Sequence, residues 1–319
     1  MSAAHLAWLM VASKRARKRN LKSDAINYKR ASCKHLVSIG SLDFSIISTG
    51  RFKEPDPAYK QFFRRPLKIL KPITVRIKES DTPAHSLPTM AGEGIKYSFD
   101  ADKTWYYAVN KKAAYYWSND PHSGKCLWTM KIVGSKLYLH TTQTGINPFR
   151  YPTDQLALMH ISSQKNGFIL HSAGGKVFGK GIAFVGASGA GKTTISRLLN
   201  KIKETELLSD DRLFIQRIKA TWSISGTPWP GEAGIAVNKS APLEALFLLK
   251  QGKDNRIEEI SSGRAFETLA STTSIPWNDK AKAESVMASI ELMLKSVPVY
   301  RFTFTPDAGA IKAIRSFCR

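Results

Sequence analysis

The pattern of hydrophobic and polar positions changes along the chain, and the clearest change lies close to residue 167. From about 95 to 142, aromatic and β-branched residues are separated by polar turns such as Ser118-Asn119-Asp120-Pro121. This pattern predicts short strands of an antiparallel sheet, with Gly134-Ser135 joining two of them. We interpret the aromatic side chains as sheet core and not as a platform for stacked bases. Residues 153–166 then predict a helix that ends at Gly167.

From Phe168 onward, short apolar strands alternate with helices. Residues 168–170 and 182–185 predict strands, and the second runs directly into a glycine-rich loop and an amphipathic helix. A strand, loop and helix in this order are typical of an α/β fold. Further along, the pattern predicts a helix around 280–295, a strand at Val299–Phe304 and a last helix from Asp307.

These patterns divide the chain into three parts. We expect a basic N-terminal tail at 1–35, a mixed, β-rich N-terminal domain at 36–165 and a nucleotide-binding domain at 166–319. A chain of 319 residues is long enough for two domains.

Composition adds a strong positive charge to this picture. The chain has 48 Lys and Arg against 25 Asp and Glu, a formal net charge of +23, which favours anionic partners of every kind without choosing between them. Five cations lie within residues 14–19. We interpret this run as a solvated tail, with a nucleic-acid or membrane-surface patch as the alternative.

Targeting and cysteine signals are weak. The apolar stretch at 6–11 precedes the cations, the reverse of a secretory signal, and no window reaches the roughly 18 to 20 apolar residues that a spanning helix needs. Cys33, Cys126 and Cys318 lie far apart without metal-ligand spacing, which indicates neither a disulfide framework nor a zinc site. We therefore expect a cytoplasmic protein.

The glycine-rich segment after residue 185 satisfies the Walker A pattern, Gly-x-x-x-x-Gly-Lys-Thr. In such a loop the backbone N–H groups and the helix N-terminus face phosphate oxygens. Lys192 would span the β and γ phosphates of ATP, and Thr193 would ligate Mg²⁺. The residues predicted to bind the nucleotide are Gly186, Ala187, Ser188, Gly189, Ala190, Gly191, Lys192, Thr193 and Thr194.

Two adjacent carboxylates follow the predicted loop and helix. Leu207 and Leu208 predict a short strand, at the end of which stand Asp210 and Asp211. One carboxylate can hold Mg²⁺ while the other accepts a proton from an attacking hydroxyl. The alternative is a solvated acidic turn.

Two spacings make this region resemble the C-terminal kinase domain of the HPr kinase/phosphorylase family, whose P-loop fold is related to phosphoenolpyruvate carboxykinase. His171 precedes Lys192 by 192 − 171 = 21 residues, as the active-site histidine of the family does. Asp210 follows Lys192 by 210 − 192 = 18 residues, where the family has its catalytic aspartate. The resemblance implies that Asp210 activates the acceptor hydroxyl, that His171 positions this base and that Thr193 helps to hold Mg²⁺. Asp211, the second carboxylate of the pair, is then the predicted acidic ligand of the metal.

The resemblance covers about residues 166 to 260 and departs from the family at one motif. Where HPr kinases have a metal-binding glutamate in Leu-Glu-Ile-Arg-Gly, residues 222–226 read Trp-Ser-Ile-Ser-Gly, and Glu232 is a nearby carboxylate that could replace it. The segment is more similar to HprK-related kinases of unassigned substrate, some of which phosphorylate the C-terminal serine of a precursor peptide.

We therefore expect a P-loop kinase domain that transfers the γ-phosphate of Mg-ATP to a hydroxyl, with serine of a peptide or protein favoured. The open alternatives are a kinase that also runs phosphorolysis, a nucleotide-binding switch without transfer, and a nucleic-acid-dependent ATPase. We expect no nucleic-acid partner, because the Walker B and sensor elements of a motor are not recognisable. A homo-oligomer is compatible with the sequence.

Overall fold

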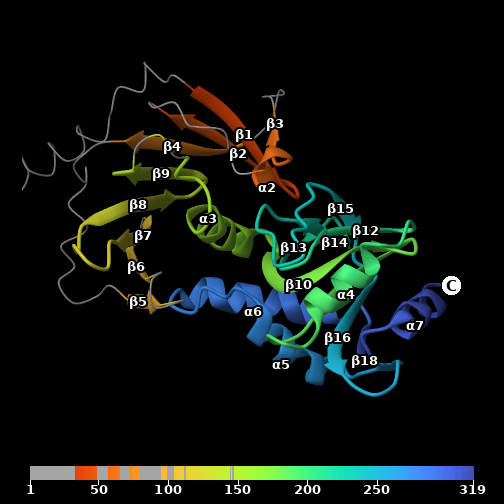
Figure 1. Ribbon diagram of the computed structural model, residues 1–319. Coiled ribbons are helices and arrows are strands. Elements are labelled where there is room, and N and C mark those ends of the chain that lie inside the picture. Colours follow the sequence, from red (N-terminus) through yellow and green to blue (C-terminus); the bar gives the residue numbers. More distant parts are fainter. Residues whose placement is uncertain are drawn as a thin grey trace, which may run out of the picture.

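The structure, a computed structural model, describes residues 33–48, 57–64, 72–79, 95–98, 104–110, 113–143, 145 and 147–319. The cation run at 14–19 lies outside these residues. The described residues form a mixed α/β protein with two nine-stranded sheets (Figure 1). Within them, no helix is both long and apolar enough to cross a membrane.

The first sheet has the strand order β3-β1-β2-β4-β9-β8-β7-β6-β5. The predicted antiparallel strands are present, and Val133 pairs with Lys136 across the predicted turn. Parallel pairing of β4 with β2 and β9 was not predicted. The elements are β1 (Cys33–Ile39), β2 (Leu42–Ser48), α2 (Pro57–Lys60), β3 (Phe63–Arg64), β4 (Ile73–Glu79), β5 (Ile95–Ser98), β6 (Thr104–Asn110), β7 (Ala113–Asn119), β8 (Cys126–Val133) and β9 (Lys136–Thr141).

A buried helix lies between this sheet and the rest of the chain. The predicted helix is α3 (Thr153–Ser162), extended by a 3₁₀ turn at Ser163–Lys165. All ten residues of α3 are buried, because the first sheet packs against it and the core formed there also includes Ile169 and Phe214 of the second sheet. Figure 1 shows α3 between the two sheets.

The second sheet has the order β15-β14-β13-β10-β11-β16-β18-β17, and β12 pairs with β10. The predicted strand Val299–Phe304 and the helices around 280–295 and after Asp307 are confirmed. The strands are β10 (Gly167–Val177), β11 (Lys180–Val185), β12 (Thr205–Ser209), β13 (Arg212–Ile218), β14 (Thr221–Gly226), β15 (Ser240–Pro242), β16 (Ala245–Gln251), β17 (Arg256–Glu259) and β18 (Val299–Phe304). The helices are α4 (Lys192–Leu199), α5 (Ser262–Thr272), α6 (Lys280–Leu294) and α7 (Ala308–Cys318).

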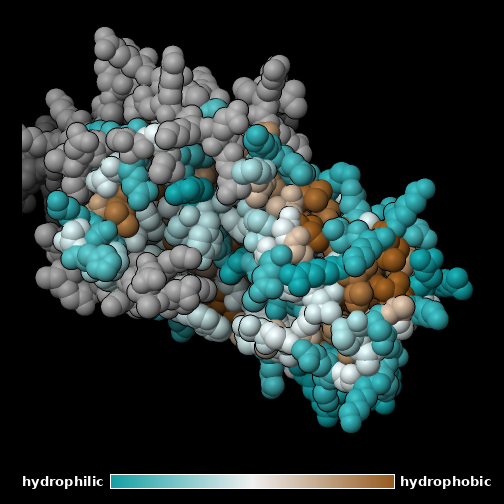
Figure 2. Space-filling model, viewed as in Figure 1, coloured by the Kyte–Doolittle hydropathy of each residue, from teal (hydrophilic) through white to brown (hydrophobic). Residues whose placement is uncertain are grey.

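Helices cover both faces of this sheet. Side chains of α5 and α6 share a core with Phe168 and Leu170 of β10, whereas α4 and α7 pack with Ala173 and Val177. On the side seen in Figure 2, hydrophilic residues dominate, and apolar residues show between them over the area of α4 and α7.

Strand β10 changes its partners halfway along. Residues 167–171 pair with β13, and residues 174–177 pair with β12 on the same edge. The opposite edge pairs with β11 from Ser172 onward and with Thr273 at Leu170. His171 therefore lies at the point where the pairing of β10 changes from β13 to β12 on one edge. On the other edge of β10, the same point is where β11 ends.

A buried carboxylate joins three segments that are distant in the sequence. Asp154 of α3, 1% exposed, accepts hydrogen bonds from Tyr59 Oη at 2.8 Å and Trp229 Nε1 at 3.0 Å. Burial raises the pKa of Asp154 to about 6, although these donors oppose the shift. The group links α2 of the first sheet, α3 and the loop after β14.

We predict that this carboxylate makes stability depend on pH. Its folded-state pKa of about 6 exceeds the ordinary value of 3.8, so the folded state binds the proton more tightly than the unfolded state does. Asp154 makes its full contribution to the free energy of unfolding below about pH 4, and this contribution decreases as pH rises through about 6. At 1.36 kcal/mol per pKa unit, the total decrease is roughly 3 kcal/mol at most. Urea unfolding between pH 4 and 8 should show this decrease in the wild type relative to Asp154→Asn. A difference that stays constant across this range would contradict the prediction.

Candidate functional site

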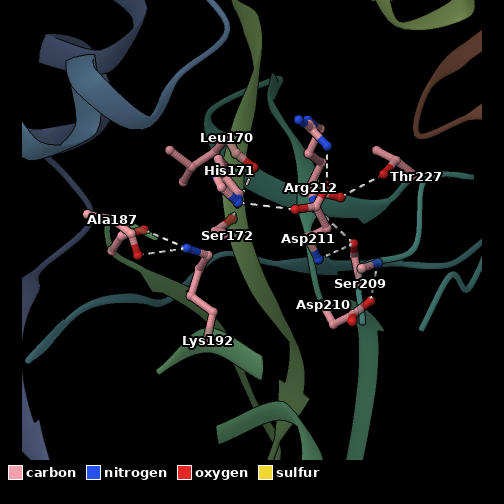
Figure 3. A network of polar contacts seen from close by, with 12 residues as sticks. Leu170, His171, Ser172, Ala187, Lys192, Ser209, Asp210, Asp211, Arg212 and Thr227 are labelled. Carbon is pink, nitrogen blue, oxygen red and sulfur yellow. Dashed lines mark hydrogen bonds and ion pairs between the residues drawn. The ribbon is translucent and has the colours of Figure 1, made fainter. Parts of the chain in front are cut away.

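The residues predicted to form the site come from three places that meet beside the middle of β10. His171 belongs to β10, the glycine loop (residues 186–191) joins β11 to α4, and Asp210 and Asp211 lie between β12 and β13. Figure 3 shows Lys192, His171 and Asp211 in one row, with Asp210 turned away toward Ser209. The predicted order of strand, loop and helix around the glycine loop is present.

The glycine loop has the backbone conformation that its sequence requires. Gly189 and Gly191 have positive φ angles of 79° and 104°. A Cβ atom at Gly191 would lie 2.6 Å from the ring of Phe304, so both conformation and space favour glycine there. Ala187, Ser188 and Gly189 are exposed at the tip of the loop.

Lys192 is held inside this loop. Its Nζ donates to the carbonyl oxygens of Gly186 at 2.7 Å and Ala187 at 3.1 Å, and the residue is 9% exposed. Burial lowers the pKa of Lys192, and the negative charge of Asp211 opposes this effect. The result is a shielded cation at the base of an exposed loop.

Asp211 is the carboxylate that faces the histidine. Its Oδ1 lies 3.1 Å from His171 Nε2, and its Oδ2 contacts Arg212 Nη1. Burial alone would raise the pKa of Asp211, but the hydrogen bond from His171 and the charges of Arg212, His171 and Lys192 lower it below the usual value. Asp211 is therefore ionised at neutral pH, and 39% of the His171 side chain remains exposed beside it.

Asp210 has a different environment from the one expected of a general base. It is 3% exposed, and its two oxygens accept three backbone hydrogen bonds, from Gly231 at 2.9 Å, Ala233 at 2.6 Å and Ile235 at 3.1 Å. These bonds fasten the loop after β14 to the end of β12. The assignment of Asp210 as the base stays a prediction, and the geometry offers Asp211 as a second candidate.

The remaining predicted ligands are more dispersed. Thr193 and Thr194 begin α4 and are half-buried. Glu232 is exposed, at 79% of its side chain, and its Oε2 lies 3.8 Å from Arg197 Nη2 of α4. Among the described residues, no three His, Cys, Asp or Glu side chains lie close enough together to hold a metal ion by themselves.

The residues present fit a magnesium nucleotide. Mg²⁺ in nucleotide sites retains water and takes few protein ligands in addition to phosphate oxygens, so a complete protein cage is not required. The exposed tip of the glycine loop, the shielded cation of Lys192 and the hydroxyl of Thr193 match the groups that bind phosphate and its metal.

Sequence reasoning missed several residues that organise the site. The hydroxyl of Ser209 accepts from the backbone N–H groups of Asp211 and Arg212, at 3.2 and 3.1 Å, and so fixes the turn. Thr227 donates to the carbonyl oxygen of Arg212 at 2.7 Å. A serine just before an acidic turn is a recognisable signal, whereas nothing local in the sequence points to Thr227.

Parts of the chain are similar to known proteins. The model of the family described as SynChlorMet cassette protein ScmC matches residues 153–307, just under half of the chain. No curated protein matches the chain. A solved structure of the Hpr(Ser) kinase/phosphatase from Coxiella burnetii is similar at 14% identity and a TM-score of 0.28, over 46% of this chain and 86% of that one.

The two aspartates should differ in what they stabilise. In Asp210→Asn, one accepting oxygen becomes a donor that faces a backbone N–H group, and we expect a loss of roughly 2 to 4 kcal/mol of unfolding free energy. In Asp211→Asn, the partly exposed ion pairs are lost, and we expect a loss of about 1 kcal/mol or less. Urea unfolding at pH 7 measures both. A loss of about 1 kcal/mol or less in Asp210→Asn would show that the loop after β14 does not depend on Asp210.

Proposed function

We propose that this chain is an ATP-dependent kinase that transfers the γ-phosphate to a hydroxyl group, with serine of a peptide or protein as the favoured acceptor. The observation that supports this most directly is the meeting of the glycine loop and Lys192 with the His171–Asp211 pair at one end of β11. A phosphate-binding loop alone is common to many functions. The ionised carboxylate of Asp211, paired with His171 beside the loop, adds a group that can accept the proton of an attacking hydroxyl.

In the proposed reaction, the acceptor oxygen forms a bond to the γ-phosphorus while the bond from that phosphorus to the β,γ-bridging oxygen breaks, so that ADP leaves. The acceptor proton passes to Asp211, whose orientation is held by Nε2 of His171 at 3.1 Å. Lys192 neutralises charge on the transferred group. When bound, Mg²⁺ would neutralise further phosphate charge, with Thr193 as a protein ligand.

This proposal moves the proton-accepting role from Asp210 to Asp211. Asp210 is 3% exposed, and its carboxylate already accepts three hydrogen bonds, from the backbone N–H groups of Gly231, Ala233 and Ile235, so an acceptor hydroxyl has little access to it. The carboxylate of Asp211 instead pairs with the side chains of His171 and Arg212, and 21% of the Asp211 side chain is exposed. Glu232 as a Mg²⁺ ligand remains a prediction, and binding of Mg²⁺ by Asp211 is the alternative to its role as the base.

The test is transfer of label from γ-labelled ATP to serine-containing peptides by the purified chain. We expect Lys192→Ala to lose nucleotide binding, because the phosphates lose their cation. We expect Asp211→Asn to keep binding and to lose transfer by at least about 100-fold, the usual size of a lost general base. Glu206→Gln is the matched control, since Glu206 is an exposed carboxylate of β12 that pairs with Lys239.

The outcomes separate the alternatives. If Asp211→Asn transfers label as fast as the wild type, Asp211 is not the base. The base is then Asp210, or neither aspartate has this role. Nucleotide binding without transfer in the wild type would favour the switch. Release of phosphate stimulated by added DNA or RNA would favour the ATPase. Formation of pyrophosphate and free serine peptide from a phosphopeptide and inorganic phosphate would add phosphorolysis.

A further inference from the structure

Two strands beside the glycine loop extend further than the strand that leads into it. β11 ends at Val185, which pairs with Leu248, whereas β16 continues to Gln251. β18 runs alongside β16 (Figure 1), and its last residue, Phe304, pairs with Gln251. At about 3.3 Å per residue, β16 extends roughly 10 Å past the end of β11. On the edge that it shares with β11, the end of β16 therefore lies beside the glycine loop and not beside a strand.

The end of β16 contacts the loop at two points. Gln251 Nε2 donates to the carbonyl oxygen of Gly189 at 2.6 Å. A Cβ atom on Gly186 would lie 3.6 Å from Cβ of Leu249, which is an ordinary van der Waals distance. Side chains two residues apart lie on the same face of a strand. Leu249 and Gln251 therefore contact the start and the tip of the loop from one face of β16.

The carbonyl groups of the loop accept hydrogen bonds from the protein itself. The carbonyl oxygen of Ala187 accepts from Nζ of Lys192 and from the backbone N–H of Ala190, both at 3.1 Å. The peptide group between Gly189 and Ala190 is thus held at both ends, because Gln251 donates to its carbonyl oxygen. A phosphate site needs N–H groups that face the anion and carbonyl oxygens that face away from it. Gln251 supplies one of these donors from a different strand, 62 positions from Gly189.

The tip of the loop has little else to fix its conformation. Ala187, Ser188 and Gly189 are exposed, and Gly189 has a φ angle of 79°. Glycine loses more conformational freedom on ordering than any other residue, so a loop that is ordered before the ligand arrives binds more tightly. Gln251 is itself exposed, and an exposed hydrogen bond contributes little to the stability of the whole fold.

We infer that Gln251 is a positioning residue of the phosphate site: it turns the carbonyl oxygen of Gly189 away from the bound phosphates and orders the loop in advance. Gln251 acts through the loop and not by contact with the nucleotide. The use of the loop for a nucleotide rests on the proposed function. The ordering of Gly189 by Gln251 does not.

The first experiment examines the loop without a ligand. Backbone ¹⁵N relaxation of the full chain reports motion of each glycine on the picosecond to nanosecond timescale. Gln251→Met keeps a side chain of similar length but removes the donor, and we expect the order parameter of Gly189 to decrease. That of Gly191, which lies next to the ring of Phe304, should stay at its wild-type value. An unchanged order parameter of Gly189 would overturn the inference.

The matched control is Gln164→Met, which makes the same change at an exposed glutamine of the 3₁₀ turn Ser163–Lys165. This variant should leave Gly189 unchanged. Urea unfolding should give the wild-type result for both variants, because neither removes a buried contact. A large loss of stability in Gln251→Met would show that Gln251 supports the fold and not the loop alone, which would contradict the inference.

The second experiment measures the binding of two Mg²⁺-loaded probes, a non-hydrolysable ATP analogue and inorganic tripolyphosphate, which has no nucleoside. We expect Gln251→Met to weaken both by about fivefold, the value of one modest hydrogen bond. In the kinase assay, KM for ATP should rise by about the same factor while kcat is unchanged, because the loop is held equally in the ground state and the transition state.

The results of this experiment separate the two proposals. Weaker binding of the analogue with unchanged binding of tripolyphosphate would mean that Gln251 contacts the nucleoside, and would overturn the inference. Equal binding of both probes by Gln251→Met and the wild type would also overturn it. A wild-type chain that binds neither probe would contradict the proposed function and the role of Gln251 in phosphate binding, whereas the relaxation data would still decide whether Gln251 orders the loop.

Discussion

The change of partners along β10 is the constraint on which the candidate site depends. One strand of eleven residues is long enough to pair with β13 in its first half and with β12 in its second half, while β11 joins only the second half. At the exchange, two loops must leave the sheet next to the same residue. The acidic turn leaves on one edge and the glycine loop on the other, and His171 lies between them. The site is thus a consequence of sheet pairing and does not depend on the sequence proximity of its residues.

The loop after β14 connects this site to the rest of the molecule. Asp210 fastens it by accepting the N–H groups of Gly231, Ala233 and Ile235, and Trp229 at its start donates to Asp154 of α3. Through Asp154 and Tyr59, the first sheet is linked to the turn that presents Asp211. The first sheet therefore supports α3 and, through Asp154, the loop that Asp210 fastens.

Local signals allowed much of the fold to be predicted. The last helix was placed by Asp307, whose carboxylate indeed accepts from the N–H of Gly309 at 2.7 Å, and the turn at Gly134-Ser135 was placed by its residue types. The strands β13 to β17 and the helix α5 were not predicted, because their pairing and burial are decided by distant contacts and not by local pattern. The division into domains at 35 and 165 stays a prediction; β1 begins at Cys33, within the expected tail.

The residues of the site could be named from the sequence, but their roles could not. The Walker A pattern predicted Lys192, the apolar residues before them predicted the aspartate pair, and the spacings from Lys192 pointed to His171 and Asp210. Which of Asp210 and Asp211 faces the histidine depends on residues 231–235, which lie more than 20 positions later and wrap around one carboxylate. No pattern in the sequence encodes that contact.

The central claim is that the glycine loop and His171 belong to one site, and NMR of the assigned histidine rings tests it most directly. Addition of Mg²⁺ with a non-hydrolysable ATP analogue should shift the ring signals of His171, and should leave those of the buried His160, which is hydrogen-bonded to Tyr116, unchanged. In Lys192→Ala the shift of His171 should disappear. Saturable binding of the analogue with no change at His171 would contradict the account.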